Sequence, residues 1–281
     1  MNKLVLLLKV SRPISYFVGG LLFFTGFVVS GAELNWLVAL NLAGLLALPT
    51  VVFGINDVYD YETDRRSARK PSRVEGFLLP KEHHEFVLHS ARISSIVALA
   101  AAASVSIVLR NFTNFLATAA VVVLAYAYSM PPTRLKEKPP LDSLTNSVGV
   151  WLLLLIGFSH NGTLFEAPLK LLYASLGVAA AHAMAAVMDF SADRAAGIKT
   201  IATSFGKRIA ALLSLAVILG ITFFSGIASL PLRLYMWLTA AFCAISFAYP
   251  SEKLVRRLFF RIGLVAFCAA LSAFVLQQFY K

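Results

Sequence analysis

The 281-residue sequence has little charge. Asp, Glu, Lys and Arg make up 14% of it, whereas hydrophobic residues make up 59%. Soluble domains contain about 25% charged and about 45–50% apolar residues. The shortage of charge therefore excludes an ordinary soluble globule and an intrinsically disordered chain. Cysteine is also scarce, because only Cys243 and Cys268 occur, each inside an apolar run. We interpret both as packing residues, so they indicate no particular redox compartment.

Long apolar runs occupy most of the chain. Several approach the roughly 20 residues that a helix needs to cross a hydrocarbon core. A bilayer admits only helices or closed barrels, and these runs lack the alternation of barrel strands. The sequence therefore predicts an all-α, polytopic membrane protein, whose first span we expect to be retained rather than cleaved near Ala32. The nine predicted spans are residues 14–30, 34–59, 86–109, 115–130, 144–158, 168–188, 209–230, 234–249 and 254–280.

Charge is especially scarce on one side of this predicted membrane. Most Lys and Arg residues precede the first span or follow the even-numbered spans, and the positive-inside rule places that side, with the N-terminus, in the cytoplasm and the C-terminus opposite. Of the 14 acidic residues, only Glu33 and Glu166 fall on the poor side. The net charge of +11 predicts attraction to anionic membrane lipid rather than to nucleic acid, and we expect Arg256, Arg257 and Arg261 to meet lipid headgroups.

Three aspartates end the second span. Asp57, Asp60 and Asp64 have helical spacings of three and four, which place them on one stripe of a helix. Like charges on one stripe repel each other unless they share a cation. Ionisable groups at the edge of an apolar span are costly and usually functional. Because Mg²⁺ prefers oxygen ligands, often carboxylates together with substrate phosphates, this stripe predicts a magnesium site.

A second acidic motif ends the sixth span. Asp189 and Asp193 are one helical turn apart and repeat the spacing of Asp60 and Asp64 four spans earlier, which favours an internal duplication. Both motifs leave the membrane on the same predicted side. Two metal ions that bridge a diphosphate are a natural use of two such facing helix ends.

Basic and aromatic residues lie near these motifs on the same side. Arg134 and Lys136 follow two prolines after the fourth span, in an extended turn from which both can reach phosphate oxygens. Tyr126 and Tyr128 precede the turn and either belong to an interfacial belt or line a cavity, where their rings favour a cation. Further candidates for phosphate binding are Lys70, Arg73 and Lys199.

Polar residues inside the spans are few. His182 lies seven residues before Asp189, on the same face and about two turns deeper, where it either contacts an acceptor, takes a proton or is simply hydrogen bonded. For Asn41 and Asn146 we favour interhelical hydrogen bonds, with Asn146 also a candidate for substrate binding. We predict no metal cluster at the histidines around the third span, since no Cys or carboxylate spacing completes one.

These motifs together resemble the UbiA superfamily of intramembrane prenyltransferases over nearly the whole chain. The resemblance rests on the runs Asn56-Asp57-x-x-Asp60-x-x-x-Asp64 and Asp189-x-x-x-Asp193, on Tyr128-Ser-x-Pro-Pro-x-Arg134-x-Lys136, and on the entry Ser-Arg-Pro to the first span. It implies one domain over residues 1–281, with nine helices around a central cavity under cytoplasmic cap loops. It also implies Mg²⁺ and an isoprenyl diphosphate, from dimethylallyl to geranylgeranyl, as ligands.

The resemblance also assigns roles. It implies that two Mg²⁺ ions and the diphosphate are held by Asn56, Asp57, Asp60, Asp64, Asp189 and Asp193. It implies that the leaving group is steadied by Arg134, Lys136 and Lys199. The segment from Asp189 to Gly206 is most similar to the lycopene elongase branch, which prenylates carotenoid ends, although that branch has another acid where this chain has Ser191-Ala192.

Other functions remain open at this stage. Lycopene or a related carotenoid is the favoured lipophilic acceptor, and an aromatic or quinone precursor or a glyceryl-ether lipid is the alternative. A cation-coupled membrane transporter is the main rival of another class, because it too carries intramembrane acids and repeats. A CDP-alcohol phosphotransferase is a further rival, but Tyr61 stands where its motif expects glycine.

Overall fold

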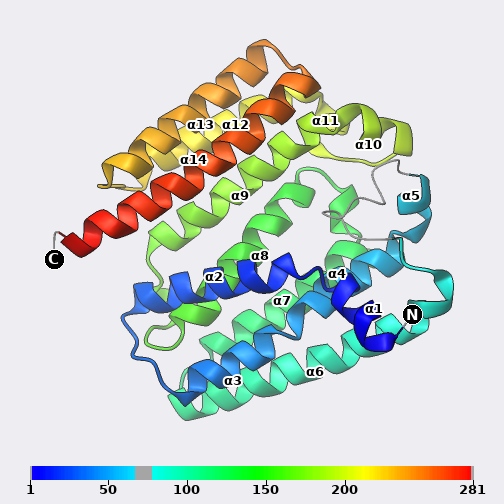
Figure 1. Cartoon of the computed structure of the whole chain (residues 1–281), viewed down its shortest axis with the longest axis vertical. Helices are drawn as coiled ribbons and strands as arrows, with labels where there is room; N and C mark the ends of the chain where they lie inside the picture. The colour runs from blue at the N-terminus through cyan, green and yellow to red at the C-terminus, as the bar shows by residue number, and fades with distance from the viewer. Residues whose placement is uncertain (1, 67–77, 280–281) are drawn as a thin grey trace. The chain divides into compact units, whose positions relative to one another are not determined.

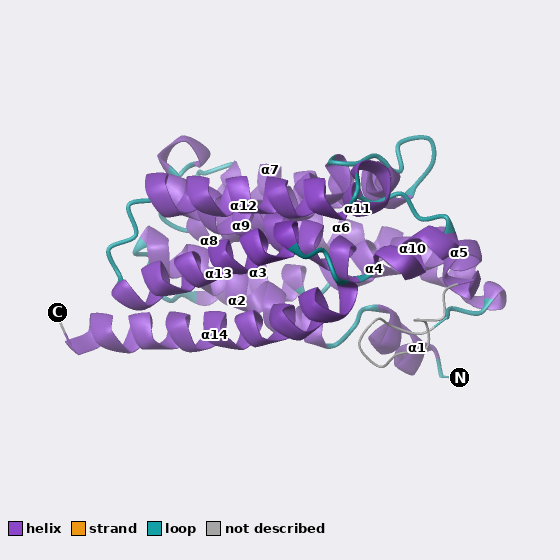
Figure 2. Cartoon of the chain, turned by 90° about the horizontal axis from the view of Figure 1, so that it is seen from above, coloured by secondary structure: helices purple, strands orange, loops and turns teal. Residues whose placement is uncertain are grey.

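A computed structural model describes residues 2–66 and 78–279 of the chain. These residues form helices joined by loops, and no strand occurs among them (Figure 2). The chain divides into two compact units, each described here by itself. Unit 1 comprises Met1–Lys136 and Val148–Leu171, and unit 2 comprises Glu137–Ser147 and Leu172–Lys281. The helix α8 (Leu141–Phe158) therefore begins in unit 2 and continues in unit 1.

The helices follow the predicted spans closely (Figure 1). Those of unit 1 are α1 (Lys3–Val10), α2 (Ile14–Ser30), α3 (Trp36–Leu45), α4 (Leu48–Tyr59), α5 (Tyr61–Arg66), α6 (His84–Leu109), α7 (Thr113–Ser129) and most of α8. Those of unit 2 are α9 (Leu169–Met188), apart from its first residues, α10 (Phe190–Ala196), α11 (Ile201–Phe205), α12 (Lys207–Phe224), α13 (Leu230–Ala248) and α14 (Glu252–Phe279). Short 3₁₀ turns occur at Lys81–His83, Leu135–Glu137 and Leu164–Glu166.

Within the described residues, six segments are long and apolar enough to cross a membrane: α3 with α4, α6 with its preceding turn, α8, α9, α12 and α13. The number rises to seven when α1 and α2, which meet at an angle of 55°, count as one span. The helix α7 is apolar but shorter. An all-helical, multi-pass chain is thus confirmed, whereas nine crossings stay a prediction.

The second predicted span is not one continuous helix. It breaks between α3, which ends at Leu45, and α4, which begins at Leu48. Pro49 lies four residues after Leu45. It has no N–H for the Leu45 carbonyl, and its ring would clash with that carbonyl in an unbroken helix. The span expected over residues 34–59 is confirmed as one apolar segment, Trp36–Tyr59, with a local break before this proline.

Helices α2 and α8 approach closely in the core of unit 1. A Cβ atom added at Gly26 would collide with the backbone carbonyl of Leu154, and one added at Gly157 would collide with the carbonyl of Phe23. Small residues permit such approaches between membrane helices, where packing rather than hydrophobic burial drives association. The core around this crossing is built mainly from Phe, Val, Ile, Leu and Ala side chains of α2, α4, α6, α7 and α8.

A buried polar cluster closes one end of unit 1. The side chain of Asn114 in α7 exchanges hydrogen bonds of 2.8 and 3.2 Å with Asn41 in α3 and donates to Ser159 Oγ at 2.8 Å. Nε2 of His160 lies 3.1 Å from the side-chain Oδ1 of Asn41, and its ring meets the rings of Phe23 and Phe27 edge-on. The interhelical role expected for Asn41 is confirmed.

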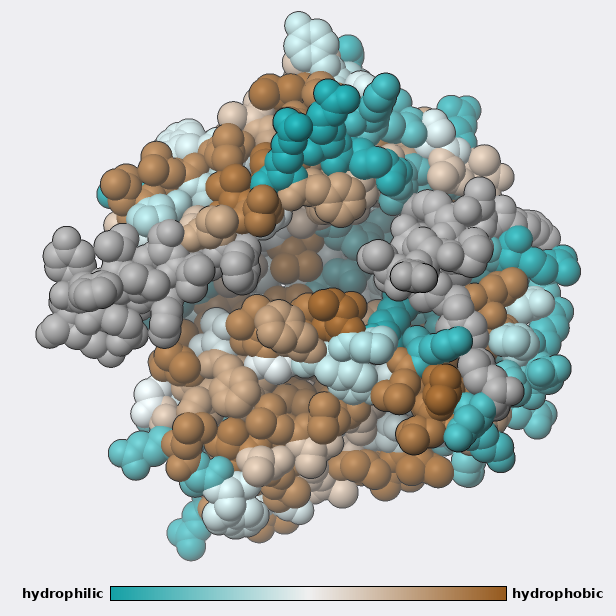
Figure 3. All heavy atoms as spheres, in the orientation of Figure 1, coloured by the Kyte–Doolittle hydropathy of each residue, from teal (hydrophilic) through white to brown (hydrophobic). Residues whose placement is uncertain are grey.

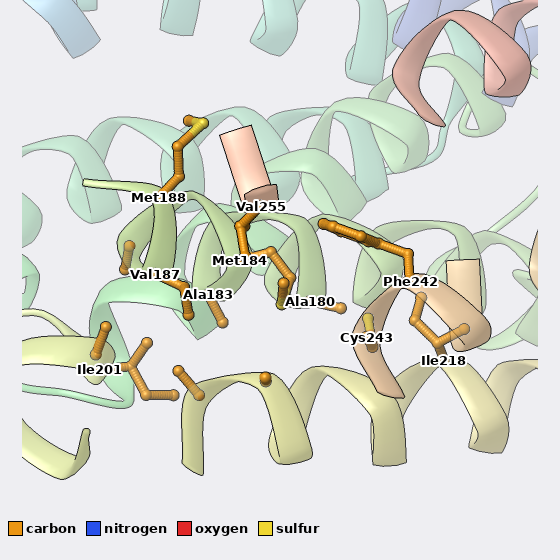
Figure 4. Close-up of a cluster of buried hydrophobic side chains, with 14 of the residues drawn as sticks. Ala180, Ala183, Met184, Val187, Met188, Ile201, Ile218, Phe242, Cys243 and Val255 are labelled. Atoms are coloured by element: carbon orange, nitrogen blue, oxygen red, sulfur yellow. The ribbon is translucent and has the colours of Figure 1, made fainter. Parts of the chain in front are cut away.

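The core of unit 2 lies between α9, α12 and α13 (Figure 4). Alanines and larger side chains both contribute to it, such as Ala180 and Met184 of α9 and Ile218 of α12. The Ser214 hydroxyl donates a hydrogen bond to the Ala180 carbonyl, which ties α12 to α9. Cys243 is buried in this core, as predicted. Cys268 is exposed, so its interpretation as a packing residue was wrong.

Apolar side chains also cover the outside of the helices. Hydrophobic atoms spread over much of the face shown in Figure 3. Exposed examples include Phe17 on α2, Ile96 on α6, Val123 on α7 and Phe224 on α12. Exposed apolar patches of this extent are unfavourable in water and favourable in lipid, which agrees with an integral membrane protein.

Candidate active site

The two acidic motifs share one backbone device. Asp60 stands between α4 and α5 with φ −95° and ψ −2°, and Asp189 stands between α9 and α10 with φ −108° and ψ 7°. A ψ near 0° opens the helical turn, and residues of many active sites adopt this region. In each motif one helix therefore ends and the next begins at an aspartate, Asp60 or Asp189. The sequence predicted one unbroken helix at these positions.

Backbone hydrogen bonds cross each break. The N–H of Asp60 donates to Asn56 at 2.9 Å, and that of Asp64 donates to Asp60 at 2.8 Å. In the same way, Asp189 N–H donates to the Ala185 carbonyl at 3.1 Å and Asp193 N–H donates to Asp189 at 2.9 Å. The helical spacing is thus kept across the opened turn. The predicted correspondence of the two motifs extends to their backbone hydrogen bonds.

Asp57 is buried at the first motif, with 2% of its surface exposed. Its Oδ1 accepts a hydrogen bond of 3.1 Å from the guanidinium of Arg12, which also lies over the Phe53 ring. Arg12 has φ 53°, a left-handed conformation that is uncommon for residues other than glycine. Sequence reasoning did not list Arg12 as a site residue, because no local spacing links residues 45 positions apart.

Asp60 gathers donors from two segments of unit 1. Its Oδ2 accepts a 2.8 Å hydrogen bond from the Asn56 amide, while its Oδ1 contacts Lys136 and lies 3.7 Å from Arg134. Arg134 also has a positive φ, 35°, and donates to the Tyr59 carbonyl at 3.4 Å. The two basic residues of the turn therefore point to the same carboxylate, as their two-residue spacing suggested.

Asp189 and Asp193 belong to unit 2. Asp193 is buried within α10, which ends at Gly197 with φ 72°. Asp189 Oδ1 accepts a 2.7 Å hydrogen bond from Arg256 of α14, which also donates to the Met188 carbonyl. Arg256 was expected to meet lipid headgroups, and its place at Asp189 corrects that expectation. The sequence did not reveal this contact, because more than 60 residues separate Arg256 from the motif.

A second contact joins α14 to α10. Glu252 accepts hydrogen bonds from Ser191, at 2.7 Å from the hydroxyl and 3.3 Å from the N–H, and lies 3.4 Å from Lys207. Burial raises the pKa of Glu252, but the hydrogen bonds from Ser191 and Lys207 outweigh it and hold the pKa below its ordinary value. The carboxylate is thus charged and holds the helix that carries Asp193.

His182 lies on α9, where its Nδ1 is 3.1 Å from the Ser143 hydroxyl. Ser143 and its neighbour Asp142 are both buried in the first turn of α8. Asn146, one turn further along α8, donates to the Asp142 carbonyl at 2.8 Å. That bond lies within α8 and is therefore not interhelical.

The remaining candidates are two tyrosines and three basic residues. Tyr126 and Tyr128 are half-buried on α7, the first of them against the core of unit 1. Lys199 is exposed after α10. Lys70 and Arg73 lie outside the described residues.

The donor set suits Mg²⁺ rather than a softer metal. Within residues 2–66 and 78–279, no three His, Cys, Asp or Glu side chains form a preformed metal cluster. Magnesium does not need one, since it is commonly held by one or two carboxylates together with water and substrate phosphates. Carboxylates neutralised by Arg and Lys, as at Asp57 and Asp60, provide both the oxygen ligands and the cations that a metal–phosphate ligand requires.

Known proteins resemble the chain over most of its length. It is 35% identical to lycopene elongase/hydratase of Corynebacterium glutamicum over 225 residues, which span 78% of this chain and 76% of that protein. It is 32% identical to lycopene elongase/hydratase of Halobacterium salinarum over 58% of this chain and 55% of that protein. The structure of a UbiA homolog from Archaeoglobus fulgidus bound to DMAPP and Mg²⁺ aligns with a TM-score of 0.68 at 21% identity, covering 96% and 98% of the two chains.

A family model adds the extent of the match. The model of the UbiA prenyltransferase family matches residues 14–258, from the start of α2 into α14, and so includes both acidic motifs. The chain therefore belongs to the UbiA prenyltransferase family.

Proposed function

We propose that the protein transfers an isoprenyl group from an isoprenyl diphosphate to a lipophilic acceptor within the membrane. The observation that carries this proposal is the repeated device at Asp60 and Asp189, where each opened helical turn presents aspartates beside basic side chains. A diphosphate needs both kinds of group. A transporter or a CDP-alcohol phosphotransferase is not supported, because the family that the chain belongs to is one of prenyltransferases.

The proposal includes the arrangement of the whole chain. We infer one domain over residues 1–281 with nine crossings around a central cavity, the N-terminus and cap loops cytoplasmic and the C-terminus opposite. Both acidic motifs lie on the cytoplasmic side in this proposed arrangement. Their ligands for Mg²⁺ would be Asn56, Asp57, Asp60, Asp64, Asp189 and Asp193. Bound Mg²⁺ would supply positive charge that stabilises the departing diphosphate.

The chain's own residues perform the remaining tasks. Arg134 and Lys136, now paired with Asp60, turn to the phosphate oxygens and stabilise the leaving group as the allylic C–O bond breaks. Arg12, paired with Asp57, and Arg256, paired with Asp189, also turn to the phosphate oxygens. Further phosphate contacts come from Lys70, Arg73 and Lys199. The tyrosine rings of Tyr126 and Tyr128 face the allylic cation, and Asn146 borders the acceptor.

The apolar interior has its own function in this reaction. An allylic cation is rapidly captured by water, so a dry cavity lined by hydrophobic residues protects it until the acceptor attacks. A site at the end of membrane helices also lets the isoprenyl tail and a lipophilic acceptor enter from the lipid.

We propose a carotenoid, lycopene or a close relative, as the acceptor. The support is the 35% identity to lycopene elongase/hydratase of Corynebacterium glutamicum over most of both chains. An aromatic or quinone precursor and a glyceryl-ether lipid are the alternatives, because members of one fold share a diphosphate site while their acceptors differ.

The test is an incubation of membranes that contain the protein with labelled dimethylallyl or geranylgeranyl diphosphate, Mg²⁺ and lycopene, with products identified by mass spectrometry. We expect a labelled carotenoid that is absent when EDTA is present and returns with excess Mg²⁺. Label in a quinone precursor or in an ether lipid would identify an alternative acceptor. Full turnover in EDTA would overturn the metal's role, and no labelled product with any acceptor would overturn the transferase.

A further inference from the structure

Unit 2 contains a compact polar cluster in addition to the acidic motif at Asp189. Asp142 and Ser143 contribute to it from the first turn of α8, and His182 contributes from the middle of α9. The Ser143 hydroxyl and His182 Nδ1 are 3.1 Å apart. The backbone N–H of Ile201, the first residue of α11, donates to Asp142 Oδ2 at 3.2 Å. Three segments distant in sequence thus meet at one carboxylate and one imidazole.

The Asp142 carboxylate is only half satisfied. The residue is 1% exposed, and its Oδ1 is buried without a hydrogen-bond partner in the described part of the chain. A buried acceptor without a partner costs about 1–3 kcal/mol, and more when it is charged, so native structures rarely keep one without a reason. Asp142 is also close enough to His182 to interact with it electrostatically. A carboxylate in this position stabilises a neighbouring imidazole that gains a proton.

The depth of His182 suits an acceptor for a proton released from carbon. It precedes Asp189 by seven residues, so it lies on the same face of the helix, about 10 Å deeper along its axis. The cation forms on the acceptor, beyond the carbon that leaves the diphosphate, and so lies deeper in the membrane than a diphosphate bound at Asp189. Imidazole is also the side chain whose ordinary pKa lies nearest to neutrality, as a group that takes up and releases a proton in each turnover requires.

We propose that His182 is the base that ends the transfer reaction, and that Asp142 and Ser143 are positioning residues for it. This inference rests on the proposed function. The allylic C–O bond breaks and its electron pair leaves with the diphosphate. The π electrons of an acceptor double bond then form the new C–C bond and leave a cation on the acceptor. A neighbouring C–H bond breaks, its electrons form a new double bond, and its proton passes to Nε2 of His182.

The parts of the cluster have separate tasks in this step. In the tautomer that this step requires, Nδ1–H donates to the Ser143 hydroxyl, 3.1 Å away, and the lone pair is on Nε2. Asp142 then stabilises the imidazolium. Without a base, water captures the same cation and leaves an alcohol in place of the alkene.

The experiment compares release of diphosphate with formation of product in purified protein, using labelled dimethylallyl diphosphate and lycopene. In His182→Gln, which stays polar but is not basic, we expect formation of alkene product to fall by about 10²-fold. Diphosphate release should fall much less, and the ratio of alcohol to alkene should rise. In His182→Ala, added imidazole should restore the alkene. Asp142→Asn and Ser143→Ala should shift the product ratio in the same direction, but less.

A matched control is available in the other unit. His160 is also a buried, hydrogen-bonded histidine, so His160→Gln should leave the product ratio unchanged. A wild-type product ratio in His182→Gln would overturn the proposal. So would equal losses of diphosphate release and of product in all three cluster variants, since a merely structural role predicts them. A wild-type protein that prenylates no acceptor would overturn the proposed function instead.

Discussion

Asp60 is held by three kinds of donor: the amide of Asn56, the guanidinium of Arg134 and the ammonium of Lys136. Removing one partner of such a partly buried ion pair leaves the other charge uncompensated and destabilises the fold. The same side chains that neutralise Asp60 are those that we expect to bind phosphate. Substitutions at this position therefore affect both the fold and the chemistry, and isosteric changes separate the two effects best.

We predict that Asp60→Asn or Asp193→Asn lowers prenyl transfer by at least about 10²-fold, because a metal ligand and its charge are lost. The variants should still insert into the membrane. The measurement is product formation per amount of inserted protein, with Glu82→Gln, a change at an exposed carboxylate, as the control. Wild-type turnover in either aspartate variant would contradict the assignment.

Because His160 is buried, we predict that the protein loses stability as the pH falls. Burial lowers its pKa to about 4 from the ordinary 6.5. The unfolded chain then binds more protons than the folded one between these values, so the stability from this group is complete above pH 6.5 and is lost as the pH falls towards 4. In detergent, the midpoint of thermal unfolding should fall over that pH interval, and it should fall less in His160→Gln. An identical pH dependence in the two proteins would contradict it.

At the scale of helices, α2 and α8 cross closely at Gly26 and Gly157. We predict that Gly26→Ala and Gly157→Ala each destabilise the protein by about 1–3 kcal/mol, because the added methyl group must push two backbones apart. Gly19→Ala on the same helix α2 is the control, since nothing lies within 4 Å of its added Cβ. The measurement is the midpoint of thermal unfolding. Equal midpoints for Gly26→Ala and Gly19→Ala would argue against the close crossing.

The contact between α14 and α10 leads to a prediction about activity. We expect Glu252→Gln to reduce prenyl transfer several-fold, because the weakened bonds to Ser191 loosen the helix that carries Asp193. Ser191→Ala should have a similar effect, and the double variant should be little worse than either single one, since both remove the same interaction. Additive losses in a full cycle of initial rates would show that the two residues act separately.

Sequence alone predicted most of the helices and the closeness of Arg134 and Lys136 to each other. Apolar runs identify spans because every backbone group in lipid must be bonded within its own helix. The spacing of Asp60 and Asp64, and its repetition at Asp189, identified the motifs. Periodicity does not reveal the opened turns at Asp60 and Asp189, because ψ near 0° keeps the four-residue hydrogen bonds. It also missed Arg12 and Arg256, whose partners are distant in the chain.

At the scale of the whole molecule, orientation follows from the distribution of charge. Thr133 lies before α8 and Phe165 lies after it, both exposed. We predict that these loops lie on opposite sides of the membrane, with Thr133 in the cytoplasm. In a chain without Cys243 and Cys268, a membrane-impermeant thiol reagent should label Phe165→Cys in intact cells and Thr133→Cys only after lysis. The reverse pattern would overturn the orientation.

The pairing of Asp57 with Arg12, and of Asp60 with Arg134 and Lys136, has a consequence for the resting enzyme. Because Arg and Lys side chains already neutralise these carboxylates, we predict that the protein does not need Mg²⁺ to stay folded. Chelation of Mg²⁺ should therefore stop turnover reversibly. The melting temperature should stay nearly constant, and turnover should resume when Mg²⁺ is added back. In a cell that is short of Mg²⁺, this enzyme would stay folded but inactive.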